Sequence, residues 1–179
     1  MSPETWEDRN DAYFLERYRD ERRCRSVLAI CFSTNNETFH HWRIFAHGGA
    51  GVCIEFNRQS LLKSFEGVKG FSKREVVYKW IGDLQNNPPM LEDWPFLKRK
   101  SFEAESEYRV VFETKTESLR AKSVEFDLTS IQRVTLSPWL PESISSSIIE
   151  IIQKIDGCSG LKVERSSLLD NTGWRDIVK

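Results

Sequence analysis

Two glutamates and an arginine occupy alternate positions in residues 102–113 (FEAESEYRVVFE), where an acidic stretch leads into an apolar one. If the strand extends back to Glu105, then Glu105, Glu107 and Arg109 project from one face and the carboxylates lie within about 7 Å of each other. Such a pair can act as a general base or stabilise a cation, while the arginine keeps a neighbouring carboxylate ionised or binds phosphate. The alternative is an exposed strand face held together by salt bridges.

Two basic segments could contact phosphate groups. Residues 17–25 contain five arginines, and Lys98-Arg99-Lys100 precedes the acidic strand. Together with aromatic side chains such as Tyr18 and Trp94, they could bind a diphosphate or a nucleic acid. Acidic residues are interleaved with the arginines, so a solvated face of ion pairs is the simpler alternative.

The residue patterns of other common functional sites are missing from the sequence. His40, His41 and His47 lie on one predicted helix, but His40 and His47 are roughly 10 Å apart along its axis, too far for one metal ion. Cys31 and Cys53 lie within apolar strand patterns, which predicts buried free thiols. The sequence contains no glycine-rich phosphate loop and no G-x-S-x-G nucleophile motif. We therefore predict no metal site, no dinucleotide fingerprint and no α/β-hydrolase chemistry.

The composition indicates a globular protein. The chain has 179 residues, of which 39% are apolar and 12% aromatic, enough to form one domain with a sizeable core. The net charge of -1 gives no general attraction to nucleic acid or to an anionic membrane. The polar start is not a signal peptide, and no apolar run approaches the ~20 residues of a membrane span. The expected location is a reducing cytoplasm.

The elements that would position these residues begin with residues 27–57. Residues 27–33 are apolar on both faces, which predicts a strand in the middle of a sheet. Thr34 and Glu37 have the spacing of a capping box and predict a helix that ends at Gly48-Gly49. A strand at 50–56 follows. The core-facing side of the helix is predicted to consist of Phe39, Trp42, Phe45 and Ala46.

The rest of the chain reads as alternating helices and strands. Helices are predicted from about Asp11 to 23, at 59–65, at 90–100 and after Pro141; strands at 73–80, 105–113, 124–128, 131–136 and 161–166; and a loop at 82–89. The last helix would face the core with Ile144, Ile148, Ile152 and Ile155. The strand–helix–strand unit at 131–166 favours a locally parallel pair. The predicted fold is α+β, with a mixed β-sheet of about six to seven strands and flanking helices in a single domain, 1–179.

An ordered set of short motifs extends over nearly the whole chain. The set comprises Pro3-x-x-Trp6-x-Asp8-x-x-Asp11, Cys31-Phe32-Ser33, Trp42-x-x-Phe45-Ala46, Gly51-Val52-x-Ile54-x-Phe56, Lys100 with Glu105-x-Glu107-Tyr108-Arg109, Ile131-x-x-Val134, Ser137-Pro138 and Val163-x-x-Ser166. In this order the motifs resemble a bacterial family of unknown function, the one numbered 2971 (DUF2971). The resemblance implies an intracellular bacterial protein from mobile or defence-related gene neighbourhoods.

The strand order of that family and its E-x-E-Y-R motif are similar to those of ADP-ribosyltransferases, which implies NAD as the substrate. By this analogy Ser33 is the second-strand hydroxyl, and Glu105 or Glu107 is the acid that faces the nicotinamide ribose. The substrate-binding residues assigned with it are Trp42, Arg43, Lys100 and Arg109.

One departure leaves alternatives open. Relatives carry an additional N-terminal strand before the Pro-x-x-Trp-x-Asp segment, whereas this chain begins almost at that segment. The first catalytic position is therefore unassigned, with Arg43 or an arginine of 17–25 as substitutes. We weigh three functions: a NAD-using transferase in toxin or antiphage defence, a non-catalytic module that binds nucleic acid or protein, and a subunit whose exposed sheet edge pairs in a homo- or hetero-oligomer.

Overall fold

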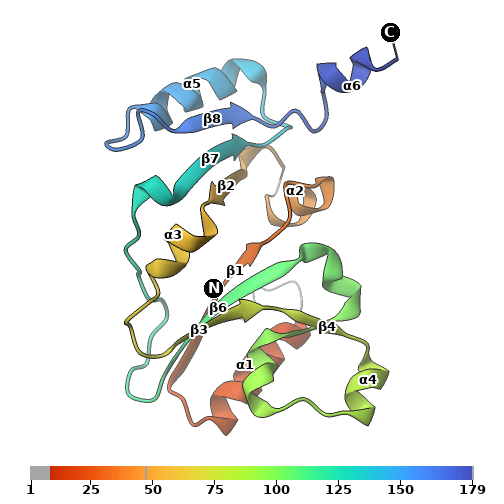
Figure 1. Ribbon diagram of the computed structural model, residues 1–179, viewed down its shortest axis with the longest axis vertical. Coiled ribbons are helices and arrows are strands. Elements are labelled where there is room, and N and C mark those ends of the chain that lie inside the picture. Colours follow the sequence, from red (N-terminus) through yellow and green to blue (C-terminus); the bar gives the residue numbers. More distant parts are fainter. Residues whose placement is uncertain (1–8, 47, 179) are drawn as a thin grey trace. The chain divides into compact units, whose positions relative to one another are not determined.

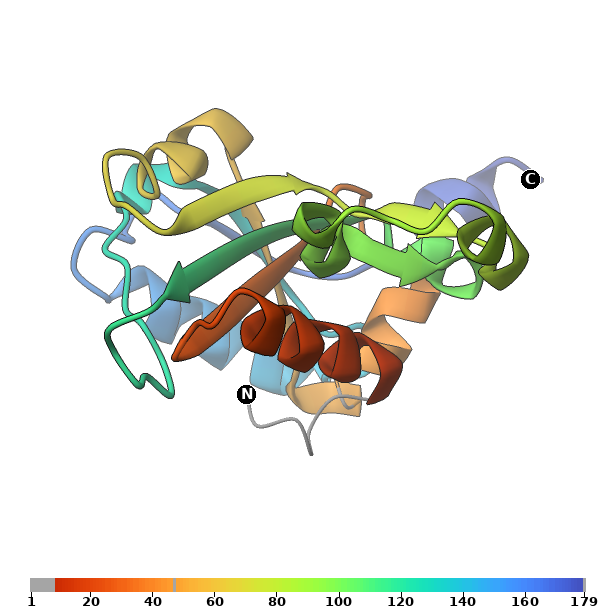
Figure 2. The same cartoon turned by 90° about the horizontal axis from the view of Figure 1, so that it is seen from below.

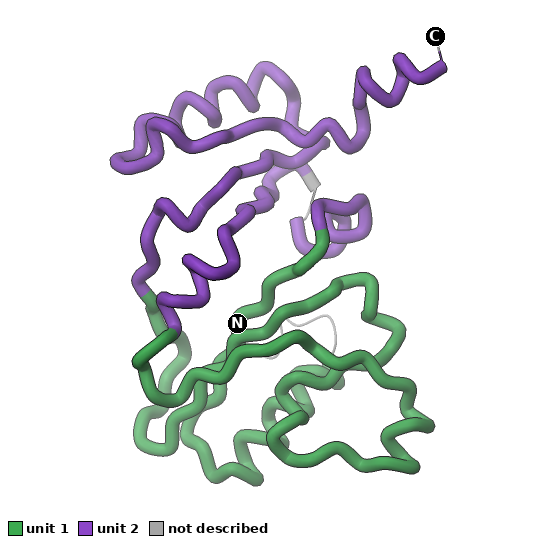
Figure 3. The backbone as a smooth tube through the Cα atoms, in the orientation of Figure 1, with its two compact units in different colours: residues 1–35, 66–124 green, residues 36–65, 125–179 purple. Residues whose placement is uncertain are grey.

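The computed structural model describes residues 9–46 and 48–178. These residues form an α+β fold (Figure 1), so the predicted class is confirmed. The described residues contain eight strands in three sheets, where the sequence predicted six or seven strands in one mixed sheet. The chain divides into two compact units (Figure 3): unit 1 comprises residues 1–35 and 66–124, and unit 2 comprises residues 36–65 and 125–179.

Unit 1 contains a three-stranded antiparallel sheet and a small parallel pair. Its sheet has the order β1-β6-β3, and β4 pairs with β5. Helix α1 lies along the sheet (Figure 2). The elements are α1 (Arg9–Glu21), β1 (Ser26–Ser33), β3 (Phe71–Glu75), β4 (Val77–Lys79), α4 (Ile81–Asn86), the 3-10 helix η3 (Leu91–Phe96), β5 (Leu97–Arg99), the 3-10 helix η4 (Lys100–Glu105) and β6 (Glu107–Thr114).

The central strand of unit 1 is β6, whose residues from Glu107 to Phe112 are all buried. The prediction that residues 27–33 lie in the middle of a sheet was wrong. Within the described residues β1 pairs with β6 alone, and Ile30 is 50% exposed. The apolar sequence of β1 is compatible with an edge because α1 packs against the strand.

Three further predictions for unit 1 were wrong in part. The strand predicted at 73–80 is divided into β3 and β4 at the buried Val76, whose N–H donates to the Glu107 carbonyl at 2.9 Å. The predicted loop contains helix α4, which ends at Asn86, before Pro88-Pro89. The helix predicted at 90–100 is η3 followed by β5, since Pro95 lacks the N–H that an α-helix would use.

Unit 2 is built on a mixed sheet with the order β2-β7-β8. Strands β2 and β7 are antiparallel, whereas β7 and β8 are parallel, as the strand–helix–strand pattern predicted. Its elements are α2 (Phe39–Phe45), the 3-10 helix η2 (Gly48–Ala50), β2 (Val52–Phe56), α3 (Arg58–Lys63), the 3-10 helix η5 (Leu128–Ser130), β7 (Ile131–Leu136), α5 (Glu142–Gln153), β8 (Lys162–Arg165) and α6 (Thr172–Asp176).

Helix α5 covers one face of this sheet. The core consists of Val134, Leu136 and Val163, against which Ile131, Leu140, Ile148, Ile149, Ile152 and Leu161 pack. Of the four predicted core isoleucines, Ile144 and Ile155 are 48% and 54% exposed, because they lie at and beyond the ends of α5. The prediction of a strand at residues 124–128 was wrong, because this segment is irregular. Phe126 packs edge-on against Phe56, with ring centroids 5.7 Å apart.

Helix α2 begins four residues later than the capping box predicted. Thr38, and not Thr34, is its N-cap, and the Thr38 hydroxyl accepts a hydrogen bond from His41 N at 3.1 Å. Of the predicted core-facing residues only Trp42 is buried, whereas Phe39 and Phe45 are 50% and 58% exposed. A helix of seven residues presents only two turns to the core, so a single large side chain occupies it.

Candidate functional site

The two glutamates of the E-x-E motif flank a left-handed turn in unit 1. Glu105 is the last residue of η4, Ser106 has a φ of 45°, and β6 begins at Glu107. The prediction that the strand extends back to Glu105 was therefore wrong. The Ser106 carbonyl accepts hydrogen bonds from the Thr34 N–H and hydroxyl at 2.8 and 2.9 Å, which secures the turn to the end of β1.

Arg109 is the centre of a buried ionic network. Its side chain is 0% exposed and donates to both carboxylate oxygens of Asp11 at 2.9 and 2.8 Å. Its Nε and Nη2 donate to the two oxygens of Glu107 at 2.5 and 2.9 Å, and its Nη1 also donates to the Pro95 carbonyl at 2.8 Å. Two bidentate pairs thus fix α1 and β6 to the same guanidinium.

Lys98 is the second cation of the network. Its Nζ lies 2.5 Å from Glu105 Oε2, 3.3 Å from Glu107 Oε2 and 3.9 Å from Asp11 Oδ2. Each of the five side chains is at most 10% exposed. Three carboxylates therefore share two cations in a site largely closed to water, where charge interactions are strong.

The network changes the pKa values of its members. Burial alone would raise the pKa of Glu107, but the hydrogen bonds and charge of Arg109 outweigh it and hold this pKa below its usual range. Burial raises the pKa of Asp11 despite Arg109. For Lys98, burial is outweighed by the hydrogen bond to Glu105 and by the surrounding carboxylates, so its pKa is raised. Glu107 is consequently ionised at neutral pH.

The two glutamates differ in how many of their carboxylate oxygens accept hydrogen bonds. Both oxygens of Glu107 accept hydrogen bonds from Arg109, and one of them also from Lys98. Glu105 accepts a side-chain bond from Lys98 through Oε2, while none of the described residues hydrogen-bonds Oε1, and the Glu105 side chain is 10% exposed. Glu105 is therefore the carboxylate that can meet a ligand.

Ser33 joins the glutamates at the end of β1. It lies directly opposite Glu107 in the antiparallel pair, and its hydroxyl donates to the Glu105 carbonyl at 3.0 Å. The Tyr78 hydroxyl accepts from Glu107 N at 2.8 Å. The structure thus brings together four of the residues that the sequence singled out, namely Ser33, Glu105, Glu107 and Arg109.

Three residues of this site have no local sequence signal. Asp11 entered the motif set only as part of its first segment, Lys98 only as part of a basic run, and Tyr78 not at all. Their approach depends on strand pairing and on α1, which a local pattern does not reveal.

The other predicted site residues lie elsewhere. Lys100 forms an ion pair with Glu103 at 2.6 Å, on the surface of η4. Trp42 and Arg43 belong to unit 2. Trp42 is buried, and its Nε1 donates to Glu37 at 2.6 Å, which indicates a structural role. Arg43 is exposed and stacks on aromatic rings.

Most arginines of residues 17–25 form ion pairs on an exposed face. This was the alternative to a phosphate-binding segment. Arg17 pairs with Glu21, Arg19 with Asp20, and Arg22 with Glu113, at 2.8 to 2.9 Å. Side chains paired in this way are less available to phosphate than unpaired ones.

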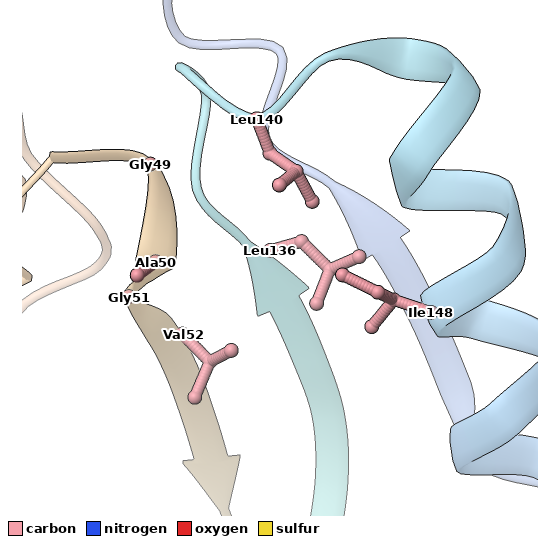
Figure 4. Close-up of a pocket in the computed structure, with 7 residues that line it drawn as sticks. All are labelled: Gly49, Ala50, Gly51, Val52, Leu136, Leu140 and Ile148. Carbon is pink, nitrogen blue, oxygen red and sulfur yellow. The ribbon is translucent and has the colours of Figure 1, made fainter.

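Unit 2 contains an apolar cavity of about 450 Å³ between β2 and α5. Figure 4 shows its lining residues, which are Gly49, Ala50, Gly51, Val52, Leu136, Leu140 and Ile148. A Cβ on Gly51 would lie 2.2 Å from the Ala46 Cβ, so the close approach of these segments requires glycine. None of the described residues that line the cavity is ionisable, and none of them is a predicted site residue.

Within 9–46 and 48–178, no three His, Cys, Asp or Glu side chains are grouped to hold a metal ion. As whole residues Cys31 is exposed and Cys53 is half-buried, where the prediction had both buried, but burial still raises the pKa of the Cys31 thiol to about 12. Pro3, Trp6, Asp8 and His47 lie outside the described residues.

A search of the described helices found none with the length and apolarity to cross a bilayer. No protein-family model, curated protein or solved structure matches the chain. The function is therefore inferred from the site.

Proposed function

We propose that the chain is an intracellular enzyme that breaks the N-glycosidic bond of NAD and transfers ADP-ribose to a macromolecule. The observation that carries the proposal is the meeting of Ser33, Glu105 and Glu107 at the adjoining ends of β1 and β6. This is the juxtaposition of a strand hydroxyl and a carboxylate pair that the resemblance to ADP-ribosyltransferases requires. The resemblance to DUF2971 suggests a role in toxin activity or antiphage defence.

Glu105 would stabilise the transition state. When the bond between nicotinamide N1 and ribose C1′ breaks, the electron pair leaves with neutral nicotinamide and positive charge develops on the ribose. A carboxylate beside C1′ lowers the energy of this charge. A nucleophile of the acceptor then bonds to C1′ and loses its proton. Lys98 occupies Oε2 of Glu105, so Oε1 is the oxygen we assign to the ribose.

Glu107 would act as a positioning residue. Its oxygens are occupied by Arg109 and Lys98, and its N–H by the Tyr78 hydroxyl. These bonds fix the start of β6, and with it the left-handed turn that carries Glu105. Removing Glu107 would leave Arg109 with one carboxylate fewer, so Glu107→Gln tests folding as much as catalysis.

The test uses Glu105→Gln with Glu103→Gln as the matched control. Both variants lose one carboxylate that pairs with a lysine on η4 or β5, but Glu103 is exposed and lies away from the network. Nicotinamide release from NAD is measured for wild-type, Glu105→Gln, Glu103→Gln and Ser33→Ala, together with thermal stability at increasing NAD. At 100 times its dissociation constant NAD adds about 2.7 kcal/mol to the free energy of unfolding.

We expect Glu105→Gln to release nicotinamide at least ~10²-fold more slowly and Glu103→Gln to match wild-type. Ser33→Ala should weaken the NAD-dependent stabilisation. If wild-type neither binds nor cleaves NAD, or if Glu105→Gln retains full activity, the proposal fails. The network then serves only to hold unit 1 together, which leaves the non-catalytic alternative.

A further inference from the structure

An arginine of unit 2 is stacked on two aromatic rings. The Arg43 guanidinium carbon lies 4.6 Å from the centroid of the Trp139 ring and 5.2 Å from that of Phe39. The two rings contact each other edge-on, with centroids 5.8 Å apart and an interplanar angle of 62°. Contacts of this kind hold a guanidinium against aromatic rings without using its N–H groups as hydrogen-bond donors.

The turn that carries Trp139 is held firmly. Ser137 and Pro138 are fully buried, and Trp139 N donates to the Ser137 hydroxyl at 3.2 Å. Arg165 of β8 donates to the Pro138 and Leu140 carbonyls at 2.5 and 2.6 Å, on either side of Trp139. The platform under Arg43 is therefore pre-organised, which reduces the entropy lost when a ligand binds.

Arg43 itself is exposed and has no carboxylate partner among the described residues. The comparison with Arg133 of the same unit is informative, since Arg133 pairs with Glu55 at 2.6 Å and with Glu164 at 3.0 Å. The nearby Glu37 accepts a bond from Trp42 Nε1. As far as residues 9–46 and 48–178 are concerned, the N–H groups of Arg43 are thus available to an anion from outside the chain.

We infer that Arg43, Phe39 and Trp139 form a binding site for a nucleotide, either free or as part of a single-stranded nucleic acid. The planar fork of Arg43 would bind phosphate oxygens in pairs. Phe39, which is 50% exposed, offers ring surface on which a base can stack. The inference stands apart from the proposed NAD chemistry, because Ser33 and Glu105 belong to unit 1.

The test measures binding of a fluorescently labelled single-stranded RNA by anisotropy, with adenosine monophosphate as a competitor. Arg43→Ala is compared with Arg133→Ala, which makes the same change in net charge in the same unit. Arg43→Lys keeps the charge but removes the planar fork. Circular dichroism melts check that the exposed substitutions leave the fold intact.

We expect Arg43→Ala and Arg43→Lys each to weaken binding about tenfold or more, and Arg133→Ala to bind as wild-type. The slope of log affinity against log salt should fall by ~0.7 in Arg43→Ala for each phosphate that the Arg43 guanidinium neutralises. Competition by adenosine monophosphate would identify a free-nucleotide site, and its absence a site that needs a longer strand. The inference is overturned if wild-type binds neither probe, if Arg43→Ala binds as wild-type, or if Arg133→Ala weakens binding as much.

Discussion

The stability of unit 1 depends on Arg109, the centre of the buried network. Replacing it with methionine leaves Asp11 and Glu107 buried without their main cation, and only Lys98 remains near them. Breaking a buried ion pair from one side costs about 3–5 kcal/mol, so we expect Arg109→Met to lower the free energy of unfolding by about that amount. Urea unfolding followed by circular dichroism measures it.

The control for this prediction is Arg133→Met in unit 2. Arg133 also contacts two carboxylates, but its side chain is 35% exposed. Exposed pairs contribute about 0–1 kcal/mol, so the control should change stability little. Equal effects of the two substitutions would show that burial of the network does not matter for stability.

Tyr18 provides a prediction about pH. Burial and the hydrogen bond from its hydroxyl to Glu113 raise the pKa of Tyr18 to about 12. Because the folded state favours the neutral phenol, this contribution to stability is complete below the ordinary tyrosine pKa of about 10 and is lost as pH rises toward 12. Tyr18→Phe should therefore flatten the loss of stability between pH 10 and 12, measured by urea unfolding. A wild-type curve already flat in this range would contradict the prediction.

At the scale of residues, the sequence indicated the reactive groups better than their partners. The spacing in residues 105–109 drew attention to Glu105, Glu107 and Arg109, but Glu105 lies in η4 and joins the network through Lys98. The Asp11–Arg109 pair joins residues 98 positions apart, and no local period encodes such a contact. The accessible oxygen of Glu105 depends on where Lys98 lies, so the distinct roles of the two glutamates required the structure.

At the scale of elements, the junction of η4 and β6 rests on one residue. Ser106 adopts a φ of 45°, a conformation that costs a residue with a Cβ about 1–2 kcal/mol. We expect Ser106→Gly to be more stable than Ser106→Ala by about this amount, because glycine has no Cβ. The two variants are comparable because both lose the hydroxyl that accepts a hydrogen bond from Asn35. Thermal unfolding of the pair tests it, and equal melting temperatures would show that the turn relaxes when the side chain changes.

Long periodic elements were predicted well and short ones were not. The isoleucine spacing predicted α5, and the apolar run predicted β7, because several residues report the same period in each. The start of α2 was misplaced because Thr34 and Thr38 are equally good caps in isolation, and tertiary packing of Trp42 decided between them. Helix α4 was hidden by a run of loop-forming residues around its end.

At the scale of the whole molecule, the chain enters each unit twice. In unit 1, β1 comes from the first stretch while β3 and β6 come from residues 66–124; in unit 2, β2 comes from residues 36–65 while β7 and β8 come from residues 125–179. Both three-stranded sheets are therefore assembled from separate stretches. The α+β class followed from the mixture of helical and strand periodicities in the sequence. The assembly of each sheet from two separate stretches could not be predicted, because hydrophobic patterns do not specify which strands pair.

The pairing of β1 with β6 has a consequence for synthesis on the ribosome. Residues 34–106 lie between the two strands, and they must be translated before β1 acquires the partner that it has in the finished sheet. At roughly 5–20 residues per second this delay is on the order of 4–15 s. During that time the segment SVLAICFS has no strand partner on either side, so an apolar β-forming sequence stays open to pairing with other chains until β6 is made.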